Sequence, residues 1–425
     1  MRAIVQGALD AVSPRAVIGA AYRDAALGPG SALTVLIVGK AASAMAATLR
    51  QVHQGPLAGL VVGTHGGAPP PLAWREGAHP VPDARSQAAA EAALTLARGV
   101  APGGRLLVLV SGGASALLAL PVHGITLEDK QETTRRLLAD GAEIGALNAV
   151  RKHLSAIKGG RLAQACPGRV DAWLLSDVVG DDPAVIGSGL TVPDPTTFGD
   201  AIEVLEAHGG RASFPAPVVA HLERGMAGAL AETPKTAADL PRARARVIAG
   251  QAQALDGARR VAERLGYQVV QRPTPVVGQA RHAAWQHLDW LRGAAASVRR
   301  PLCALSGGET TVRVTGAGRG GRNQEFALAL APRLAGGAWL VASVGTDGVD
   351  GPTDAAGAWV DGSTAARAAA AGLDPMTYLD ANDAWSFFTR VGGLIVSGPT
   401  DTNVGDLQVA LIRPPADPGE TRHAT

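Results

Sequence analysis

The sequence is poor in cysteine and lysine, and it contains no long apolar run. Only two of its 425 residues are cysteines, Cys166 and Cys303, and neither lies in a C-x-x-C motif. Two isolated thiols favour a reducing compartment without a disulfide framework, and the zinc motif H-E-x-x-H is absent. We expect no membrane span, because no stretch of about 18 apolar residues exists. We expect no signal peptide, because Asp10 and Arg15 interrupt the apolar N-terminal segment. These absences predict a soluble, cytoplasmic protein.

Excess charge is also lacking. The chain has 39 lysines and arginines against 37 acidic residues, only five of the bases are lysines, and the net charge is +2. The densest basic segment, Pro241–Val247, has no aromatic residues on which nucleic-acid bases could stack. We therefore interpret it as a solvated linker face and expect no nucleic-acid partner.

Aromatic residues make up 4% of the chain, but hydrophobic residues reach 47%, enough for large cores. Apolar runs such as Leu33–Lys40, Arg105–Gly113 and Asp171–Val178 alternate with alanine-rich segments. Such alternation predicts an α/β fold with a parallel sheet between helices, hence a Rossmann-like first domain. Prolines and the basic segment mark a boundary, so we predict domains at 1–238 and 245–425. The alternating run Thr310–Gly316 predicts a strand with one wet face and thus a mixed sheet in the second domain.

A G-x-G-x-x-G pattern occurs at Gly316, Gly318 and Gly321. As a dinucleotide fingerprint it would need a buried parallel strand before it and an acid about 20 residues beyond. Here the preceding strand carries Arg313, and the next strand ends only at Asp347. The context favours either an anion-binding loop at a helix start or a plain glycine-rich turn.

Other loops are rich in hydrogen-bond donors. Lys40 follows a buried strand and opens a helix, at the strand end where open α/β sheets bind ligands. A first Ser-Gly-Gly loop and a second one in the other half could donate backbone N–H groups to phosphate. These candidate binding residues are Ser111, Gly112, Gly113 and Ser115 in the first loop, and Ser306, Gly307 and Gly308 in the second.

Acidic residues cluster after two strands, at Asp177 and Asp181 and at Asp347 and Asp350. Aspartates in such loops serve either turn geometry or Mg²⁺ bound together with phosphates. A basic helical stretch, Leu147–Leu162, carries Asn148, Arg151, Lys152 and Lys158. It is either a solvated face or part of an anion site.

Several enzyme classes are excluded by their missing motifs. The chain has no G-x-x-x-x-G-K-[ST] phosphate loop, no protein-kinase signature and no G-x-S-x-G nucleophile elbow.

Taken together, the motifs resemble the class II glycerate kinases, glycerate 2-kinases whose C-terminal half is called the MOFRL domain. The resemblance spans about Val38 to Leu407 and rests on VGKAASAM, GAHPVPD, VSGGASALL, LNAVRKHLSAIKGGRLA, LLSDVVGDDPAVIGSGLTVPDPTTF, LSGGETTV, GGRNQEFALALA, VGTDGVDGPTDAAGAWVDG and GPTDTNVGDL. It implies two α/β domains with the active site in the cleft between them. It also implies ATP- and Mg²⁺-dependent phosphorylation of D-glycerate to 2-phosphoglycerate.

By the resemblance, Lys40 and Arg322 are the catalytic residues. The further site residues that we expect are Ser111, Gly112, Gly113, Ser115, Lys158, Ser306, Gly307, Gly308, Glu309 and Asn323 for substrate or nucleotide, and Asp177, Asp181, Asp347 and Asp350 for the metal. Asp177 is also the candidate base. Departures from the family pattern at Gln279, Asp401 and Gly405 leave contacts of the second domain open.

Alternatives remain at this point. Relatives have also been labelled hydroxypyruvate reductases, so an NAD(P)H-dependent oxidoreductase is the second hypothesis. A non-enzymatic anion sensor is the third. The oligomeric state stays open, with a homodimer as one form.

Overall fold

The computed structural model describes residues 1–25, 27–28, 30–296 and 300–413. The chain divides into two compact units. The first unit is Pro14–Ala249, and the second combines Met1–Ser13 with the chain from Gly250 onward. These units differ from the predicted domain ranges, which stay a prediction. The difference arises because the N-terminal helix α1 (Arg2–Ala11) packs on α11 (Gln251–Arg264), while β6 (Ala243–Ala249) pairs within the first unit's sheet.

The first unit is built on a six-stranded, all-parallel sheet in the order β3-β2-β1-β4-β5-β6. Besides β6, its strands are β1 (Leu33–Val38), β2 (Leu57–Gly63), β3 (Ala73–Glu76), β4 (Arg105–Val110) and β5 (Arg169–Leu175). The strand order reverses between β1 and β4. The loops after these two strands therefore meet at the carboxyl edge of the sheet, the usual ligand position in open α/β folds. The predicted Rossmann-like parallel sheet is confirmed.

Helices cover both faces of this sheet. They are α2 (Pro14–Asp24), α3 (Ala42–Val52), α4 (Ala84–Arg98), α5 (Ala114–Leu117) and α8 (Arg161–Gln164). On one face Leu36, Val38 and Val108 pack with the alanines of α4 in one apolar core. Val35 and Ile37 are equally buried on the opposite face, because side chains alternate along a strand.

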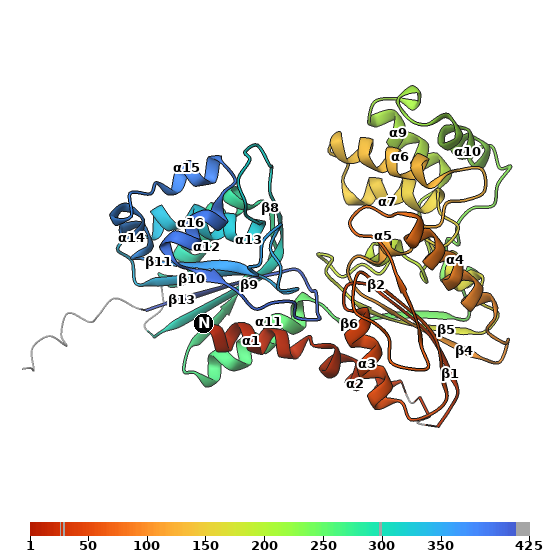
Figure 1. Ribbon diagram of the computed structural model, residues 1–425, viewed down its shortest axis with the longest axis horizontal. Coiled ribbons are helices and arrows are strands. Elements are labelled where there is room, and N and C mark those ends of the chain that lie inside the picture. The colour runs from red at the N-terminus through yellow and green to blue at the C-terminus, as the bar shows by residue number, and fades with distance from the viewer. Residues whose placement is uncertain (26, 29, 297–299, 414–425) are drawn as a thin grey trace, which may run out of the picture. The chain divides into compact units, whose positions relative to one another are not determined.

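Four further helices form a separate layer of the first unit (Figure 1). They are α6 (Leu127–Ala139), α7 (Ile144–His153), α9 (Phe198–Ala207) and α10 (Ala216–Met226). Their own core gathers around Phe198 and includes Leu147 and Leu222. Capping boxes at Thr126 and Thr197 begin α6 and α9, which fixes where these helices start. Within this layer, α7 contacts the loop after β4 through Arg151, and α6 packs on α7.

The second unit contains a mixed sheet in the order β12-β11-β10-β13-β9-β7, with β8 also paired to β9. Its strands are β7 (Gln268–Gln271), β8 (Val276–Gln279), β9 (Leu302–Thr311), β10 (Trp339–Gly345), β11 (Gly357–Asp361), β12 (Leu394–Ile395) and β13 (Asp406–Ile412). β9 is parallel to β7 and β8 but antiparallel to β13. The predicted mixed sheet is therefore confirmed.

One face of this sheet carries α1 and α11 and the other carries the remaining helices (Figure 1). These are α12 (Ala280–Ala295), α13 (Arg322–Leu330), α14 (Thr364–Ala370), α15 (Pro375–Asp380) and α16 (Ala384–Val391). In α13 every residue from Asn323 to Leu330 is buried. Polar side chains at its start therefore need partners inside the protein.

Several sequence-based expectations are wrong in detail. Ser306–Gly308 are not a loop but the middle of β9, where their backbone groups pair with β13. Pro241–Val247 is not a linker, since most of it lies in β6, whose Arg246 stacks on the Trp173 ring. The strand expected at Thr310–Gly316 ends at Thr311.

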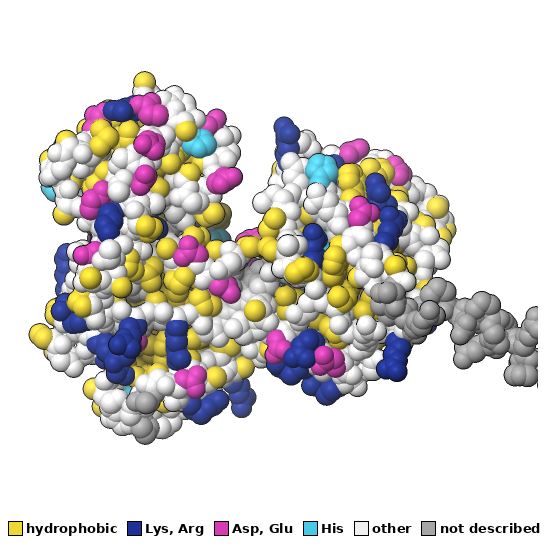
Figure 2. Space-filling model, turned by 180° about the vertical axis from the view of Figure 1, so that it is seen from behind, with side chains coloured by type: hydrophobic (Ala, Val, Ile, Leu, Met, Phe, Trp, Pro, Cys, Tyr) yellow, Lys and Arg dark blue, Asp and Glu magenta, His cyan; other side chains and the backbone are white. Residues whose placement is uncertain are grey.

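The surface shows how the arginine excess is spread. On the face seen in Figure 2, basic side chains form several separate groups with acidic side chains among them. Within the described ranges, no helix combines the length and the hydropathy needed to cross a membrane.

Candidate functional site

Lys40 stands where the strand order of the first sheet reverses. Two bonds tie its loop to the loop after β4: Lys40 N donates to Gly112 O at 2.9 Å, and Ala41 N donates to the Ser111 hydroxyl at 3.2 Å. The approach requires glycine at position 39. Gly39 has φ of +132°, and a Cβ there would lie 2.0 Å from Ser111 Oγ. The two strand-end loops thus hold Lys40 as one unit.

Gly113 shows where the Lys40 side chain runs. Its φ is +85°, and a Cβ at this position would lie 3.4 Å from Lys40 Cγ and 3.1 Å from the His79 ring. The Lys40 chain and His79 therefore pass over the glycine loop. His79 was missed by the sequence reading, although it lies in the GAHPVPD motif.

Ser111 and Ser115 have different tasks in this loop. Ser111 is fully buried and fastens the Lys40 loop. Ser115 accepts hydrogen bonds from Arg151 and from Lys158, whose ammonium lies 3.1 Å away and also donates to the carbonyls of Ser115 and Leu118. Lys158 is thus a buried residue whose hydrogen bonds hold the loop in place.

The basic stretch Leu147–Leu162 is not a single helix with a solvated face. α7 ends at His153, and the chain then turns and passes through Gly159 and Gly160, both with positive φ. Lys152 and Lys158 are buried, and Lys152 pairs with Asp194 at 3.2 Å.

In the second unit, Arg322 is the first residue of α13 and is held by two acids. Its Nε donates to both carboxylate oxygens of Asp406, at 3.0 and 2.8 Å, and its Nη1 lies 3.2 Å from Glu309. Burial would lower the pKa of Arg322, but Asp406 and Glu309 outweigh burial and raise it. Among the described residues Nη2 donates no hydrogen bond, so this nitrogen can donate to a ligand.

The glycines before α13 are explained by close packing. A Cβ at Gly316 would lie 2.2 Å from Ala381 O, one at Gly318 would lie 2.3 Å from Asp383 Cβ, and one at Gly321 would lie 2.2 Å from Asp350 Cγ. They let the loop lie against the turn before α16 and against Asp350.

Asp350 occupies the helix start that a dinucleotide would need. Its two carboxylate oxygens accept from Asn323 N at 3.0 Å and Gln324 N at 2.9 Å. In a dinucleotide fold these N–H groups would face the pyrophosphate. The geometry therefore does not favour the reductase hypothesis.

Asn323 connects the two buried carboxylates. Its amide donates to Asp406 Oδ1 at 2.8 Å and to Asp350 Oδ1 at 3.3 Å. Burial raises the pKa of Asp350 to about 6, against the hydrogen bonds of Asn323 and Gln324. Burial likewise raises the pKa of Asp406, against the charge of Arg322. Asp406 was not predicted as a site residue, since a lone aspartate opening a strand carries no motif of its own.

The metal candidates fall into both units. Asp177 and Asp181 follow β5 in the first unit and are half-buried. In the second unit, Asp347 accepts from Val349 N within its own turn, and Asp350 is engaged as described above. Across the described parts of the chain, no group of three His, Cys, Asp or Glu side chains has a metal-binding arrangement.

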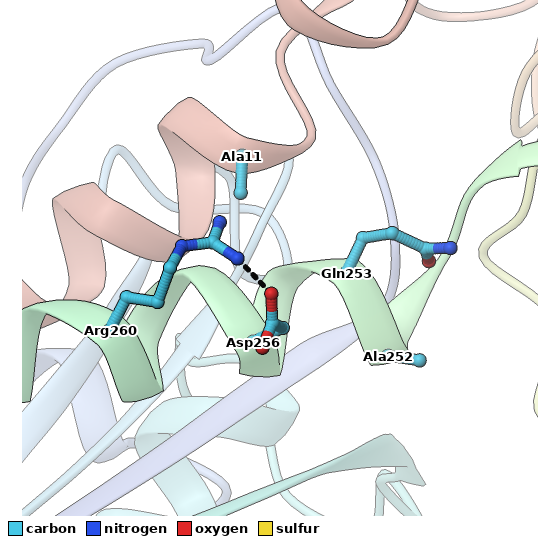
Figure 3. A pocket seen from close by; sticks show the side chains of 5 residues that line it. All are labelled: Ala11, Ala252, Gln253, Asp256 and Arg260. Carbon is cyan, nitrogen blue, oxygen red and sulfur yellow. Dashed lines mark hydrogen bonds and ion pairs between the residues drawn. The ribbon is translucent and has the colours of Figure 1, made fainter.

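A hollow between α1 and α11 is a different feature (Figure 3). It measures about 350 Å³ and is lined by Ala11, Ala252, Gln253, Asp256 and Arg260. Arg260 pairs with Asp256, and Gln253 accepts from Gly250 N at the start of α11. These polar groups thus serve α11 itself, and no predicted site residue lines the hollow.

Comparison with known proteins adds a family context. Residues 1–223 match the profile of DUF4147, a domain of unknown function, and residues 302–406 match that of the MOFRL family. The chain is 39% identical to a glycerate 2-kinase of Pyrococcus horikoshii, over 79% of this chain and 77% of that protein. It is 41% identical to an Agrobacterium vitis protein named provisionally as a hydroxypyruvate reductase, over 89% and 98% of the two chains. The crystal structure of glycerate kinase from Thermotoga maritima superposes with a TM-score of 0.84 at 37% identity, covering 96% of this chain and 97% of that one.

Proposed function

The chain belongs to the MOFRL family of glycerate kinases, and from this membership we propose that it transfers a phosphoryl group from ATP to the 2-hydroxyl of D-glycerate with Mg²⁺. The observation that best supports this proposal is the position of Lys40. It is the lysine that our sequence reading assigned to catalysis, and two hydrogen bonds lock its loop at the point where ligands bind in open α/β sheets.

Phosphoryl transfer requires positioning and charge neutralisation more than covalent chemistry. Lys40 would neutralise charge on the transferring phosphate. Arg322 would contact a phosphate or the glycerate carboxylate through Nη2, because Asp406 and Glu309 already engage Nε and Nη1. The carboxylates that fit Mg²⁺ best are Asp177 and Asp181, since parallel strands put them on the same sheet edge as Lys40. The ion would neutralise phosphate charge there.

The donor roles of Ser306, Gly307 and Gly308 are the least supported part of the proposal, because β13 already pairs with their backbone. Ser111 supports Lys40, and Asn323 supports Asp350 and Asp406, so we propose both as positioning residues. Asp177 remains our candidate for the base that accepts the substrate proton.

The proposed reaction is tested with purified protein, D-glycerate, ATP and Mg²⁺. Enolase as coupling enzyme distinguishes the products, because it consumes 2-phosphoglycerate and not 3-phosphoglycerate. We expect ADP release and enolase turnover that both depend on glycerate and Mg²⁺. Turnover of NADH or NADPH with hydroxypyruvate, without glycerate-dependent ADP release, would instead support the reductase hypothesis.

Joint action of Lys40 and Arg322 on one phosphate is a separate part of the proposal, because they belong to different compact units. Residues that act on one group are strongly non-additive. We expect the double variant Lys40→Ala/Arg322→Ala to be no slower than the slower single variant. Fully multiplicative losses would contradict shared action.

We also propose a reducing compartment such as the cytoplasm as the location of the protein. Cys166 and Cys303 are buried and free, which supports this proposal.

The protein is proposed to form a homodimer as one possible assembly, and light scattering of the purified protein tests this.

A further inference from the structure

Three of the five lysines lie inside the first unit instead of on its surface. Lys130, Lys152 and Lys158 are only 7%, 4% and 1% exposed. Lys152 has a carboxylate partner in Asp194, and Lys158 is fully hydrogen-bonded to the Ser115 loop. Lys130, in α6, differs from both, because its ammonium is buried without any hydrogen-bond partner among the described residues. Buried charges normally have a partner, so this ammonium calls for a ligand.

Besides burial, two basic residues lower the pKa of Lys130, Arg151 on α7 and Arg161 on α8. Arg151 and Lys130 likewise lower the pKa of Lys158, in the turn after α7. Asp194 and Glu232 act on Arg161 alone among these residues. Within the described chain, Lys130, Arg151 and Lys158 form no ion pair, unlike Lys152. Three cations gathered around one loop without an acid make a site for an anion.

The hydrogen bonds of this cluster run in one direction. Lys158 and Arg151 donate to Ser115 Oγ, and Ser188 donates to Asn148 Oδ1 at 3.0 Å. Ser115 must therefore donate to Ser188 across their 2.7 Å contact. In this series of hydrogen bonds, the amide oxygen of Asn148 accepts from Ser188. The amide nitrogen Nδ2 of Asn148 is then a second buried donor with no partner among the described residues. Asn148 Nδ2, which belongs to this network, and Lys130 Nζ, on the helix that packs against α7, are thus two buried donors without a partner among the described residues.

The cluster adjoins the Lys40 loop. Ser115 stands two residues beyond Gly113, past which the Lys40 side chain runs. α6 and α7, which carry Lys130, Asn148 and Arg151, pack against each other (Figure 1). Both unused donors are more than nine-tenths buried, so only the small end of a ligand can reach them. A carboxylate fits, since it offers only acceptors and is compact.

We propose that Lys130, Arg151 and Asn148 bind the carboxylate of the hydroxy acid substrate. This inference rests on the proposed function, because it assigns the acid end of the glycerate that Lys40 would help to phosphorylate. It makes the first unit the part that selects for an acid over an uncharged polyol such as glycerol.

The protonation of Lys130 gives a way to detect a carboxylate bound at this cluster. Burial and the charges of Arg151 and Arg161 lower the pKa of Lys130 to about 7 in the protein without ligand. A bound carboxylate would raise this pKa again. Binding at pH 8 would therefore take up protons, and the binding enthalpy would depend on the ionisation enthalpy of the buffer.

The first test compares Lys130→Met with Lys235→Met in the full chain. Lys235 is a partly exposed lysine outside the cluster that pairs with Glu232, so it controls for the loss of one lysine. We expect Lys130→Met to raise the KM for glycerate roughly 10- to 100-fold, as for the loss of one hydrogen bond to a charged group. The KM for ATP should stay within about threefold. A rise confined to the KM for ATP would assign the cluster to nucleotide phosphate, and unchanged KM values would leave it without a ligand. Either result overturns the proposal.

The second test is Asn148→Asp, which keeps the acceptor for Ser188 and places a carboxylate of the protein itself in the cluster. We expect a higher Tm together with loss of glycerate binding, a combination that damage to the fold could not produce. Wild-type affinity for glycerate in this variant would overturn the proposal, even if Lys130→Met failed to fold.

Calorimetric titration separates this inference from the proposed function. D-glycerate and D-lactate should bind the wild-type chain with buffer-dependent enthalpy at pH 8, while glycerol should not bind. If these acids bind but no phosphorylation occurs, the proposed reaction fails and the carboxylate site stands. If phosphorylation occurs but both variants bind glycerate normally, only the carboxylate site fails.

Discussion

Arg322 donates through Nε to both carboxylate oxygens of Asp406, and Asp406 is completely buried while Arg322 remains about one-third exposed. The buried partner thus fixes the direction of a side chain that remains partly accessible. Such an arrangement suits an arginine that must hold its orientation while it binds a ligand.

The pair predicts that Arg322 matters both for activity and for stability. We expect Arg322→Ala to lower kcat by about 10³-fold or more, as for loss of an arginine that stabilises a transferring phosphate. It should also destabilise the fold by about 3 kcal/mol, because Asp406 is left as an unpaired buried carboxylate. Arg322→Ala/Asp406→Asn should recover most of the stability, measured by urea unfolding, but none of the activity. Activity within threefold of wild type in the single variant would make Arg322 a purely structural residue.

The surroundings of Lys40 predict that arginine cannot replace lysine at this position without loss of activity. Lys40→Arg keeps the charge but replaces a compact ammonium with a planar fork, beside a loop already crowded by Gly113 and His79. We expect it to lose most of the kcat and Lys40→Ala to lose nearly all, with the Tm of both close to wild type. Full activity of Lys40→Arg in the coupled assay would show that only charge is needed at this position.

Gly39 predicts that the Lys40 loop tolerates no Cβ. Gly39→Ala would place a methyl group 2.0 Å from Ser111 Oγ at a φ of +132°, so the loop must shift and carry Lys40 with it. We expect roughly a 100-fold or greater loss of kcat, since small displacements of a positioned catalytic group have such effects. Gly103→Ala is the matched control, because no atom lies within 4 Å of its added Cβ. Equal activity of the two variants would contradict the tight coupling of the β1 and β4 loops.

Asp350 predicts a pH dependence of stability. Its pKa rises from 3.8 to about 6 in the folded chain, so the native state binds more protons than the unfolded state in that window. The contribution of Asp350 to stability is therefore largest below pH 4 and falls as the pH rises through 6, by up to about 3 kcal/mol. Asp350→Asn should lack this part of the slope when urea unfolding of both proteins is compared between pH 4 and 7. Parallel stability curves would show that Asp350 is already ionised at pH 4 in the fold.

Strands such as Leu33–Val38 and Arg105–Val110 could be read directly from the sequence, because a strand covered on both faces must be apolar throughout. The second Ser-Gly-Gly was misread for a related reason. Glycine pairs usually mark turns, but Gly308 lies inside β9, and this strand position requires glycine because a Cβ there would meet the Val276 backbone at 1.9 Å. No local pattern reports the approach of a strand that is distant in sequence.

By itself, the sequence determined the fold class and the family, and it singled out Lys40 and Arg322, whose catalytic roles stay a prediction. These follow from motifs, and a motif is a local arrangement of residue types. Only the tertiary structure decided that Asp406 orients Arg322, that Asp350 occupies the start of α13, and that Lys130 is a buried cation without a partner. Burial and pairing depend on side chains brought together from distant parts of the chain, so they arise only once the fold has formed.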